Sequence, residues 1–139
     1  MHIFGVRPDE TLVGALEYHV QTKTVRMIWV LTQDDADAPS IREALANADY
    51  TVAAGERPAP GREHREHFNT LGREHFNTLV TTWNTYAADQ DEYLDILPHV
   101  DIVVLDGMTE LNMCAWLKWA EKAGDAGWYL PRDVVVITV

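Results

Sequence analysis

Residues 25–31 read Val-Arg-Met-Ile-Trp-Val-Leu, and residues 101–105 read Asp-Ile-Val-Val-Leu. Both stretches are short, apolar and rich in β-branched residues, which is typical of strands that are buried on both faces. A third run of this kind, Asp133–Val139, closes the sequence. Strands of this type belong to parallel sheets that helices cover on both sides. These stretches therefore predict an α/β fold.

Helical and strand patterns alternate along the rest of the chain. The expected strands are His2–Val6, Val25–Leu31, Tyr50–Ala54, Asp101–Leu105 and Asp133–Val139. The expected helices are Thr11–Gln21, Ile41–Ala48, a region ending near Ala88, Asp91–Leu97 before Pro98, and Met108–Ala123. We predict one domain over residues 1–139, a three-layer α/β/α sandwich with a mostly parallel five-stranded sheet of the Rossmann-like or flavodoxin-like kind.

A tandem duplication interrupts this pattern. Residues 65–72 and 73–80 repeat seven consecutive positions without change. Eight residues turn an α-helix by about 80° beyond two full turns, so both copies cannot share one apolar stripe. The second copy fits a helical face with the residues after it, and Gly72 is the expected break. The residues of that face are Phe76, Leu79, Val80, Trp83 and Ala87.

The same region is rich in histidine and glutamate. His64 and His67 lie three apart and Glu63 and His67 four apart, so each pair could share a helical face and bind zinc. The order matches no metalloprotease spacing. We therefore favour a solvated face with Arg–Glu pairs and predict no metal site.

Composition excludes several classes of protein. The 139 residues are 47% hydrophobic and 24% charged, with a net charge of −11 and only three lysines, so direct nucleic-acid binding is not expected. There is no apolar run long enough for a membrane span and no signal peptide, and we expect a cytoplasmic protein.

The single cysteine, Cys114, has apolar neighbours and is expected to be a buried thiol. His19 is expected to be a packed histidine.

Ligands of open α/β sheets bind beyond the carboxyl ends of the strands. Asp106 and Gly107 end an apolar strand and are the best candidates, because a carboxylate beside a glycine suits hydroxyl, ribose or metal recognition. Thr109 and Glu110 would complete this wall of the ligand site, and Asp34 or Arg57 would form another. The alternative is that Asp106 only caps the following helix.

Two resemblances involve this strand. Asp91–Gly124, with Asp-Ile-Val-Val-Leu-Asp-Gly at 101–107 and with Asn112, Ala115-Trp116 and Gly124, resembles the second half of nucleoside 2-deoxyribosyltransferases, and Ile41–Val52 resembles their early helix and strand. Together these cover about half the chain. The resemblance implies a nucleoside-type ligand. The family's nucleophilic glutamate falls at Trp116 or Leu117 here, and residues 111–119 contain no acid.

Val103–Leu111 also resembles the Walker B strand of P-loop ATPases, which implies that Asp106 would orient a magnesium ion. The glycine-rich loop with its lysine is missing, and Glu10 stands near the place where the lysine is needed. We therefore do not expect an active ATPase.

The leading hypothesis is recognition of a nucleoside- or nucleotide-like ligand at the strand ends, with no catalysis required. One alternative is an acidic interaction or regulatory protein, such as a viral accessory factor, that binds a protein partner through its acidic surface and exposed tryptophans; homo-oligomerisation also stays open. The other is a glycosyl-transferring or hydrolysing enzyme that uses Asp106, Glu110 and Glu56 as acid and base. Trp116 and Trp119, three apart on a helix, are expected in the core or at an interface rather than as a stacking platform for bases.

Overall fold

The computed structural model describes residues 1–7, 9–58 and 77–139. Within them, five strands form one sheet: β1 (His2–Gly5), β2 (Met27–Thr32), β3 (Thr78–Thr82), β4 (Val100–Asp106) and β5 (Val135–Thr138). Their order is β1-β5-β4-β2-β3, and all four pairings are parallel. The predicted parallel α/β fold is confirmed.

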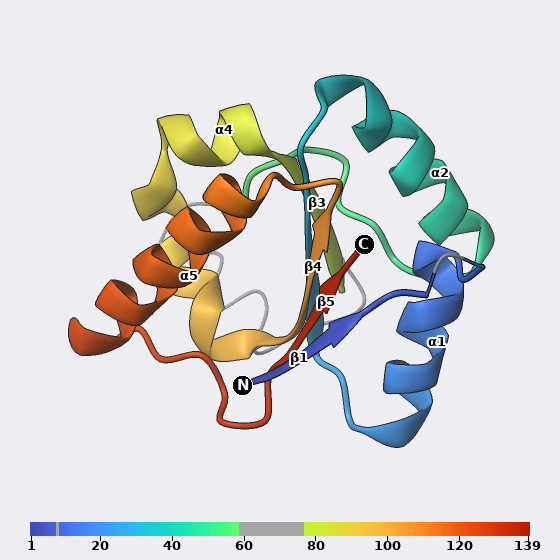
Figure 1. Ribbon diagram of the computed structural model, residues 1–139. Coiled ribbons are helices and arrows are strands. Elements are labelled where there is room, and N and C mark those ends of the chain that lie inside the picture. The colour runs from blue at the N-terminus through green and yellow to red at the C-terminus, as the bar shows by residue number, and fades with distance from the viewer. Residues whose placement is uncertain (8, 59–76) are drawn as a thin grey trace.

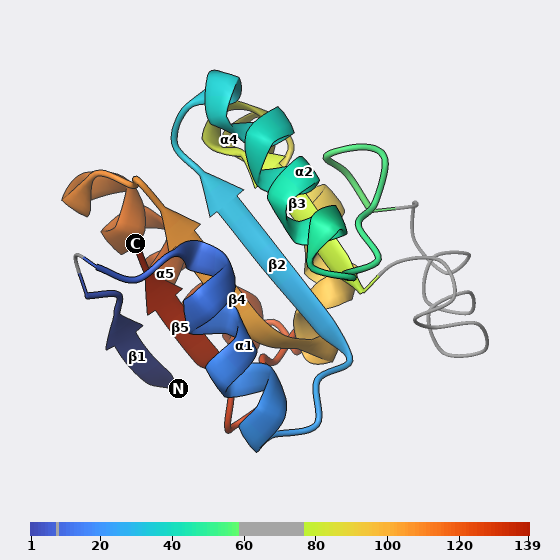
Figure 2. The same ribbon diagram turned by 90° about the vertical axis from the view of Figure 1, so that its right-hand side faces the viewer.

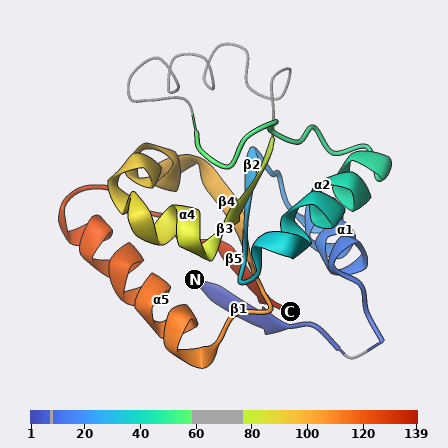
Figure 3. The same cartoon turned by 90° about the horizontal axis from the view of Figure 1, so that it is seen from above.

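Helices cover both faces of the sheet (Figures 1 and 3). One face carries α1 (Leu12–Thr22) and α2 (Ala38–Asn47), and the other carries α4 (Trp83–Ala88), the 3-10 helix η3 (Gln90–His99) and α5 (Glu110–Asp125). A short 3-10 turn, η1 (Asp35–Asp37), precedes α2. The result is the predicted three-layer sandwich.

The central strands are buried on both faces because apolar residues occupy both sides of their pleat. In β2, Met27, Trp29 and Leu31 face the α5 side, whereas Ile28 and Val30 face the α1 side. Each of these five side chains is at most 1% exposed. The uninterrupted apolar runs that predicted parallel strands therefore serve two separate cores.

The strands lie in the order of a flavodoxin-like sheet, except that one edge strand comes from the start of the chain and not from its end. Read from the β3 edge, the order is β3-β2-β4-β5-β1. This matches the flavodoxin-like order 2-1-3-4-5 if β2 is counted as its first strand and β1 as its fifth. The N-terminal strand thus occupies the edge position that the last strand takes in that order.

The α5-side core is built around aromatic rings. The Trp29 ring stacks on Tyr93 with 5.1 Å between centroids and 10° between planes, and its Nε1 donates a hydrogen bond to Thr81 Oγ1 at 3.1 Å. Trp116 is fully buried beside it, and Trp119 is partly buried in the same cluster. The core interpretation of these two tryptophans is confirmed. The expectation that tryptophans are exposed for a protein partner is wrong, because all five are buried or partly buried: Trp29, Trp83, Trp116, Trp119 and Trp128.

A buried carboxylate fixes the start of β4 against β2. The Asp101 side chain, 6% exposed, accepts hydrogen bonds from the Arg26 backbone N–H at 2.7 Å and from Arg26 Nη2 at 3.1 Å. Both residues lie at the amino ends of their strands, whereas the predicted ligand site lies at the carboxyl ends.

Two sequence predictions for the third strand are wrong. Tyr50–Ala54 is not a strand, and only Val52 forms a single bridge, to Thr78. Thr78–Thr82, predicted as helix, is the strand beside β2, because its five residues are all buried and four of them are β-branched. His64 and most of the duplicated segment 65–80, including His67, Gly72 and Phe76, lie outside the described residues.

The structure confirms the predicted cap of α1 and contradicts the predicted burial of Cys114. Thr11 caps α1 as expected, accepting a hydrogen bond from Gly14 N at 3.0 Å. Cys114, expected to be buried, is exposed. The reason is that Trp116, Ala120 and Ala123 carry the buried face of α5, so Cys114 falls on its outer side.

Candidate functional site

The strands that follow β2 and β4 along the chain are added on opposite sides of this pair, so the strand order switches between β2 and β4. After β2 it continues through α2 to β3 on one side, and after β4 it continues through α5 to β5 on the other. The two connections lie on opposite faces of the sheet (Figure 3). In open α/β sheets, ligands usually bind at such a switch point, outside the carboxyl ends of the two strands. Here the two strands end at Thr32 and Asp106, which are register partners, and the predicted ligand region beyond these strand ends is called the crevice below.

Asp106 is held in place by its neighbour across the ladder. Thr32 Oγ1 donates a hydrogen bond to Asp106 Oδ2 at 3.0 Å, and Gln33 N donates to the Asp106 carbonyl oxygen at 3.0 Å. Thr32 is fully buried, whereas Asp106 is half-buried. The other carboxylate oxygen, Oδ1, receives no hydrogen bond from residues 1–7, 9–58 or 77–139. It is the acceptor that a ligand in the crevice would meet.

The surroundings of Asp106 oppose its ionisation. Burial raises the pKa of this carboxyl, and the negative charges of Asp37 and Asp34 raise it further, while the Thr32 hydrogen bond lowers it less than these effects raise it. Asp34 thus contributes to the site through its charge. Carboxylates whose pKa is raised by burial and like charge are common at functional sites.

Asp106 does not cap the helix that follows it. Helix α5 begins at Glu110, and its N-cap is Thr109, whose Oγ1 accepts a hydrogen bond from Asn112 N at 3.1 Å. The capping alternative for Asp106 is therefore wrong, and Thr109, predicted as a ligand residue, is the cap. Glu110 lies exposed in the first helical turn.

A glutamine that the sequence analysis did not single out links the two sides of the crevice. Gln33 Oε1 accepts hydrogen bonds from Asn112 Nδ2 at 2.8 Å and from Thr109 N at 3.3 Å. Gln33 follows β2, whereas Thr109 and Asn112 begin α5. The only sequence signal for Gln33 was its position directly after a buried strand.

Gly107 adopts a backbone conformation that favours glycine, with a φ of +63°. Its N–H donates to the Val139 carbonyl at 3.1 Å, so this N–H is already used within the protein. A Cβ placed on Gly107 would meet nothing within 4 Å. Gly107 therefore gives the site a turn and open space rather than a hydrogen-bond donor.

Arg57 lies away from Asp106, at the β3 side of the sheet. Its Nη1 contacts Asp89 Oδ2 and Glu92 Oε2, the second at 2.9 Å. Hydrogen bonds from the guanidinium to Glu92 and Asp89 raise the pKa of Arg57. Since two acids already bind this cation, the structure does not bring Arg57 together with the Asp106 wall.

Glu56 lies at the carboxyl end of β3, and its carboxylate is engaged by the start of α4. Its Oε1 accepts from Thr82 N at 2.7 Å. Burial opposes ionisation, but hydrogen bonds from Thr82 and Thr85 and the charge of Arg42 outweigh it, so the pKa of Glu56 is lowered. Register pairs Thr82 with Thr32 and Thr32 with Asp106. The two carboxylates thus stand on either side of β2 with pKa values shifted in opposite directions.

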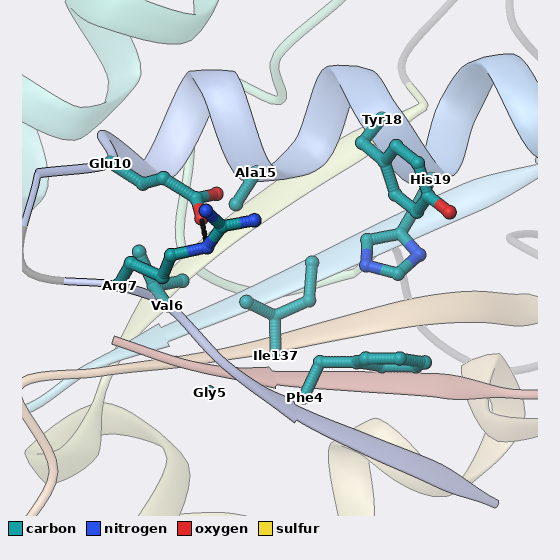
Figure 4. Close-up of a pocket in the computed structure, with 9 residues that line it drawn as sticks. All are labelled: Phe4, Gly5, Val6, Arg7, Glu10, Ala15, Tyr18, His19 and Ile137. Atoms are coloured by element: carbon teal, nitrogen blue, oxygen red, sulfur yellow. Dashed lines mark ion pairs between the residues drawn. The ribbon is translucent and has the colours of Figure 1, made fainter.

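A separate pocket of about 520 Å³ lies between α1 and the outer edge of the sheet (Figure 4). His19 lines it, 8% exposed, with its ring 4.8 Å from Phe4 and 5.1 Å from Tyr18. Burial, followed by the nearby charge of Lys23, lowers the pKa of His19. The predicted packed histidine is confirmed. None of the residues that line this pocket belongs to the Asp106 crevice.

Metal ligands and known relatives give no further assignment. Among the described residues, no three histidines, cysteines or acids lie close enough together to hold a metal ion. In the same part of the chain, no helix is long and apolar enough to cross a membrane. No protein-family model matches the chain, and no curated protein matches it. The resemblances to deoxyribosyltransferases and to the Walker B strand stay predictions.

Proposed function

We propose that the crevice between the carboxyl ends of β2 and β4 binds a nucleoside-like ligand through its sugar hydroxyls, without catalysis. The observation that carries the proposal is the Asp106 carboxylate. It lies at the switch point of the sheet, one of its oxygens is held by Thr32, and it caps no helix. In dinucleotide-binding α/β sheets a carboxylate at the ligand site likewise accepts a hydrogen bond from a ribose hydroxyl.

The charge of the crevice favours a neutral ligand over a phosphorylated one. Asp34 and Asp37 are close enough to raise the pKa of Asp106. A phosphate beside these groups would meet like charges, and two unit charges 4 Å apart near a protein surface interact by about 4 kcal/mol. Lys and Arg side chains, which usually bind phosphate, are missing from the contacts of Asp106, Gln33 and Thr109 within the described residues. We therefore infer nucleosides rather than nucleotides as the ligand class.

Thermal unfolding with a panel of ribonucleosides, 2′-deoxynucleosides and nucleotides, with and without magnesium, tests the proposal. A ribonucleoside at 100 times its Kd is expected to stabilise the protein by about 2.7 kcal/mol. The matching 2′-deoxynucleoside is expected to shift the melting temperature less, because the hydroxyl that Asp106 accepts is missing. Asp106→Ala should abolish the shift, and Glu43→Gln, which removes an exposed acid on α2, should keep it.

Three results would contradict this function. One is the lack of a shift with every compound, and another is an equal shift in Asp106→Ala. The third is a shift that appears only with nucleotides and magnesium, which would place a metal-bridged phosphate in the crevice.

A hydrolytic function is the second candidate, and one observation favours it. Asp106 and Glu56 have pKa values shifted in opposite directions, as an acid and a base that share a site commonly do. Release of free base from a nucleoside, lost in Asp106→Asn and in Glu56→Gln, would support hydrolysis. Binding without any release of base supports the binding function alone.

A further inference from the structure

The two edges of the sheet differ in how their backbone groups are used. At the β3 edge, Thr78 N donates to the Thr51 carbonyl at 3.1 Å, and Ala53 N donates to the Thr78 carbonyl at 2.9 Å. At the other end of β3, Thr82 N donates to Glu56 Oε1. This edge is thus covered by the protein's own chain at both ends, which is one way in which proteins protect an edge strand.

The β1 edge has no such cover from the described residues, and it lies at the outside of the sheet (Figure 2). His2 N donates to the Val134 carbonyl at 3.0 Å and Val6 N to the Thr138 carbonyl at 2.9 Å. Even-numbered residues of β1 therefore direct their backbone groups toward β5. Because successive residues of a strand alternate, Ile3 and Gly5 direct their N–H and C=O groups outward.

Apolar side chains gather at this open edge. All four residues of β1 are exposed, including Ile3 at 57% and Phe4 at 45%. Met1 and Tyr18 beside them are 49% and 64% exposed. Seven large hydrophobic side chains are exposed in the described part of the chain, and these four are among them. Such a concentration marks an interaction surface.

A pocket lies on each face of the sheet next to β1. The pocket of about 520 Å³ on the α1 side is lined by Phe4, Gly5 and Val6, whose place against α1 is seen in Figure 4. A second pocket of about 440 Å³, on the α5 side, is lined by Met1 and Leu117 among others. A strand added to this edge would direct alternate side chains to the two faces and so toward the two pockets.

We propose that β1 pairs antiparallel with β1 of a second copy of this chain, so that two sheets join across a two-fold axis. The outward groups fix the register. Hydrogen-bonded antiparallel pairs exchange both N–H···O bonds, so odd-numbered residues must face odd-numbered residues. An overlap centred on Ile3 then places Ile3 opposite the partner's Ile3, and Met1, whose ammonium already donates one hydrogen bond to the Arg132 carbonyl at 3.1 Å, opposite the partner's Gly5. In this register His2 faces Phe4 of the other copy on the α1 side.

The distribution of charge favours contact between two copies at the β1 edge, because the excess of acids lies elsewhere in the chain. The chain carries a net charge of −11, so two copies repel each other over most of their surfaces. Residues 1–8 contain no acid, and they include His2 and Arg7. Arg7 pairs with Glu10 at 3.1 Å, which offsets the charge of one acid beside the edge. The β1 edge is therefore a part of the surface where two copies can approach with little electrostatic cost, and a second copy brings an edge strand with the same outward backbone groups.

Sedimentation equilibrium over a range of concentrations and cysteine crosslinking test the proposal. The wild-type protein is expected to reach twice its chain mass of 15.7 kDa. Ile3→Lys places like charges opposite each other at the two-fold axis and should raise the dimer dissociation constant at least tenfold. Tyr129→Lys, at an exposed hydrophobic residue outside the edge, should leave it unchanged.

The crosslink tests the register, in a Cys114→Ser background that removes the natural exposed thiol. Ile3→Cys should form a disulfide-linked dimer, because paired Cα atoms lie about 5.5 Å apart and disulfides span about 4.4–6.8 Å. Phe4→Cys should not, because its two copies would lie roughly 8 Å apart, given about 3.4 Å of rise per residue. Circular dichroism and thermal unfolding would verify that each variant is folded.

The proposal is overturned if the wild-type protein stays monomeric at all concentrations, or if Ile3→Lys leaves a dimer intact. A dimer in which Phe4→Cys crosslinks and Ile3→Cys does not would overturn the register and the two-fold axis with it. A monomer whose β1 edge instead binds an unrelated strand would replace the second copy by another partner.

Discussion

Asp106→Asn is expected to stabilise the fold at pH 7, although it changes a residue that is half-buried and hydrogen-bonded. Asparagine keeps the shape of the side chain, and its Oδ1 can still accept the hydrogen bond from Thr32. The substitution removes a charge that burial and the neighbouring Asp37 and Asp34 disfavour. A side chain whose charge lowers the free energy of unfolding is better explained by a role in function than by a role in folding.

The size of the effect follows from opposing contributions. A hydrogen bond to a charged group is worth about 1.5–3 kcal/mol and one to a neutral group about 0.5–1.5 kcal/mol, so the variant loses about 1 kcal/mol at Thr32. The raised pKa of Asp106 means that burial and repulsion outweigh this hydrogen bond in the native protein. A net gain of about 0.5–2 kcal/mol is expected, the usual range for stabilising substitutions of this kind.

The dependence on pH makes the test specific. Because the folded state raises the pKa above its ordinary value of 3.8, the penalty of ionised Asp106 is fully present above the folded pKa and is absent below the ordinary value. Wild-type protein should therefore regain stability relative to Asp106→Asn as the pH falls through this window. Urea unfolding of both proteins at neutral pH and near pH 3.5 measures the difference.

A matched control separates this local effect from general relief of the negative charge. Glu43→Gln removes one negative charge from an exposed position of α2, so both variants change the net charge from −11 to −10, since −11 + 1 = −10. Only Asp106→Asn should show the gain that vanishes at low pH. If Asp106→Asn instead loses more than about 1 kcal/mol at neutral pH, the side chain is a structural acceptor and the reasoning fails.

Substitutions at three further positions test the fold by urea unfolding. Trp29→Ala, which empties the aromatic core against Tyr93, should cost about 3–5 kcal/mol, and Trp29→Phe, which keeps a ring there, should cost clearly less. Gly107→Ala should cost about 1–2 kcal/mol through its positive φ alone, since the added Cβ meets open space, and Gly107→Asn should cost less; equal costs would point to crowding instead. Asp101→Ala should cost about 1–3 kcal/mol, because it leaves the Arg26 backbone N–H without its acceptor, and a neutral result would mean that water replaces the carboxylate.

The central sheet could be predicted from the sequence because burial on both faces leaves an unmistakable pattern. Apart from Arg26 and Asp101, Val25–Leu31 and Asp101–Leu105 carry apolar residues on both faces, which is typical of a parallel strand between two helical layers. The third strand was missed because Leu79, Val80 and Trp83 also fit helical spacing. Periodicity alone could not distinguish the two over five residues, and the β-branched threonines of Thr78–Thr82 were the better signal.

The candidate site was predictable in part for a similar reason. The carboxyl ends of parallel strands meet at one edge, so Asp106 and Asp34 could be placed together from strand positions alone. The position of Arg57 could not be predicted, because it depends on Asp89 and Glu92, which come from the segment after β3, and that strand had been assigned elsewhere. The role of Gln33 depends on a contact across the switch point that no local pattern encodes.

The net negative charge bears on both proposals, and the salt dependence of dimerisation is expected to differ from that of nucleoside affinity. Raising the salt concentration to 1 M shortens the Debye length to about 3 Å and screens repulsion between copies of an acidic protein. Pairing through β1 depends on backbone hydrogen bonds and apolar contacts, so salt should strengthen the dimer. A neutral nucleoside beside Asp106 gains little from screening, and its affinity should change little over the same range. A ligand whose affinity instead rises with salt would carry negative charge into the crevice, and the acids around Asp106 would then serve a different partner from the one inferred here.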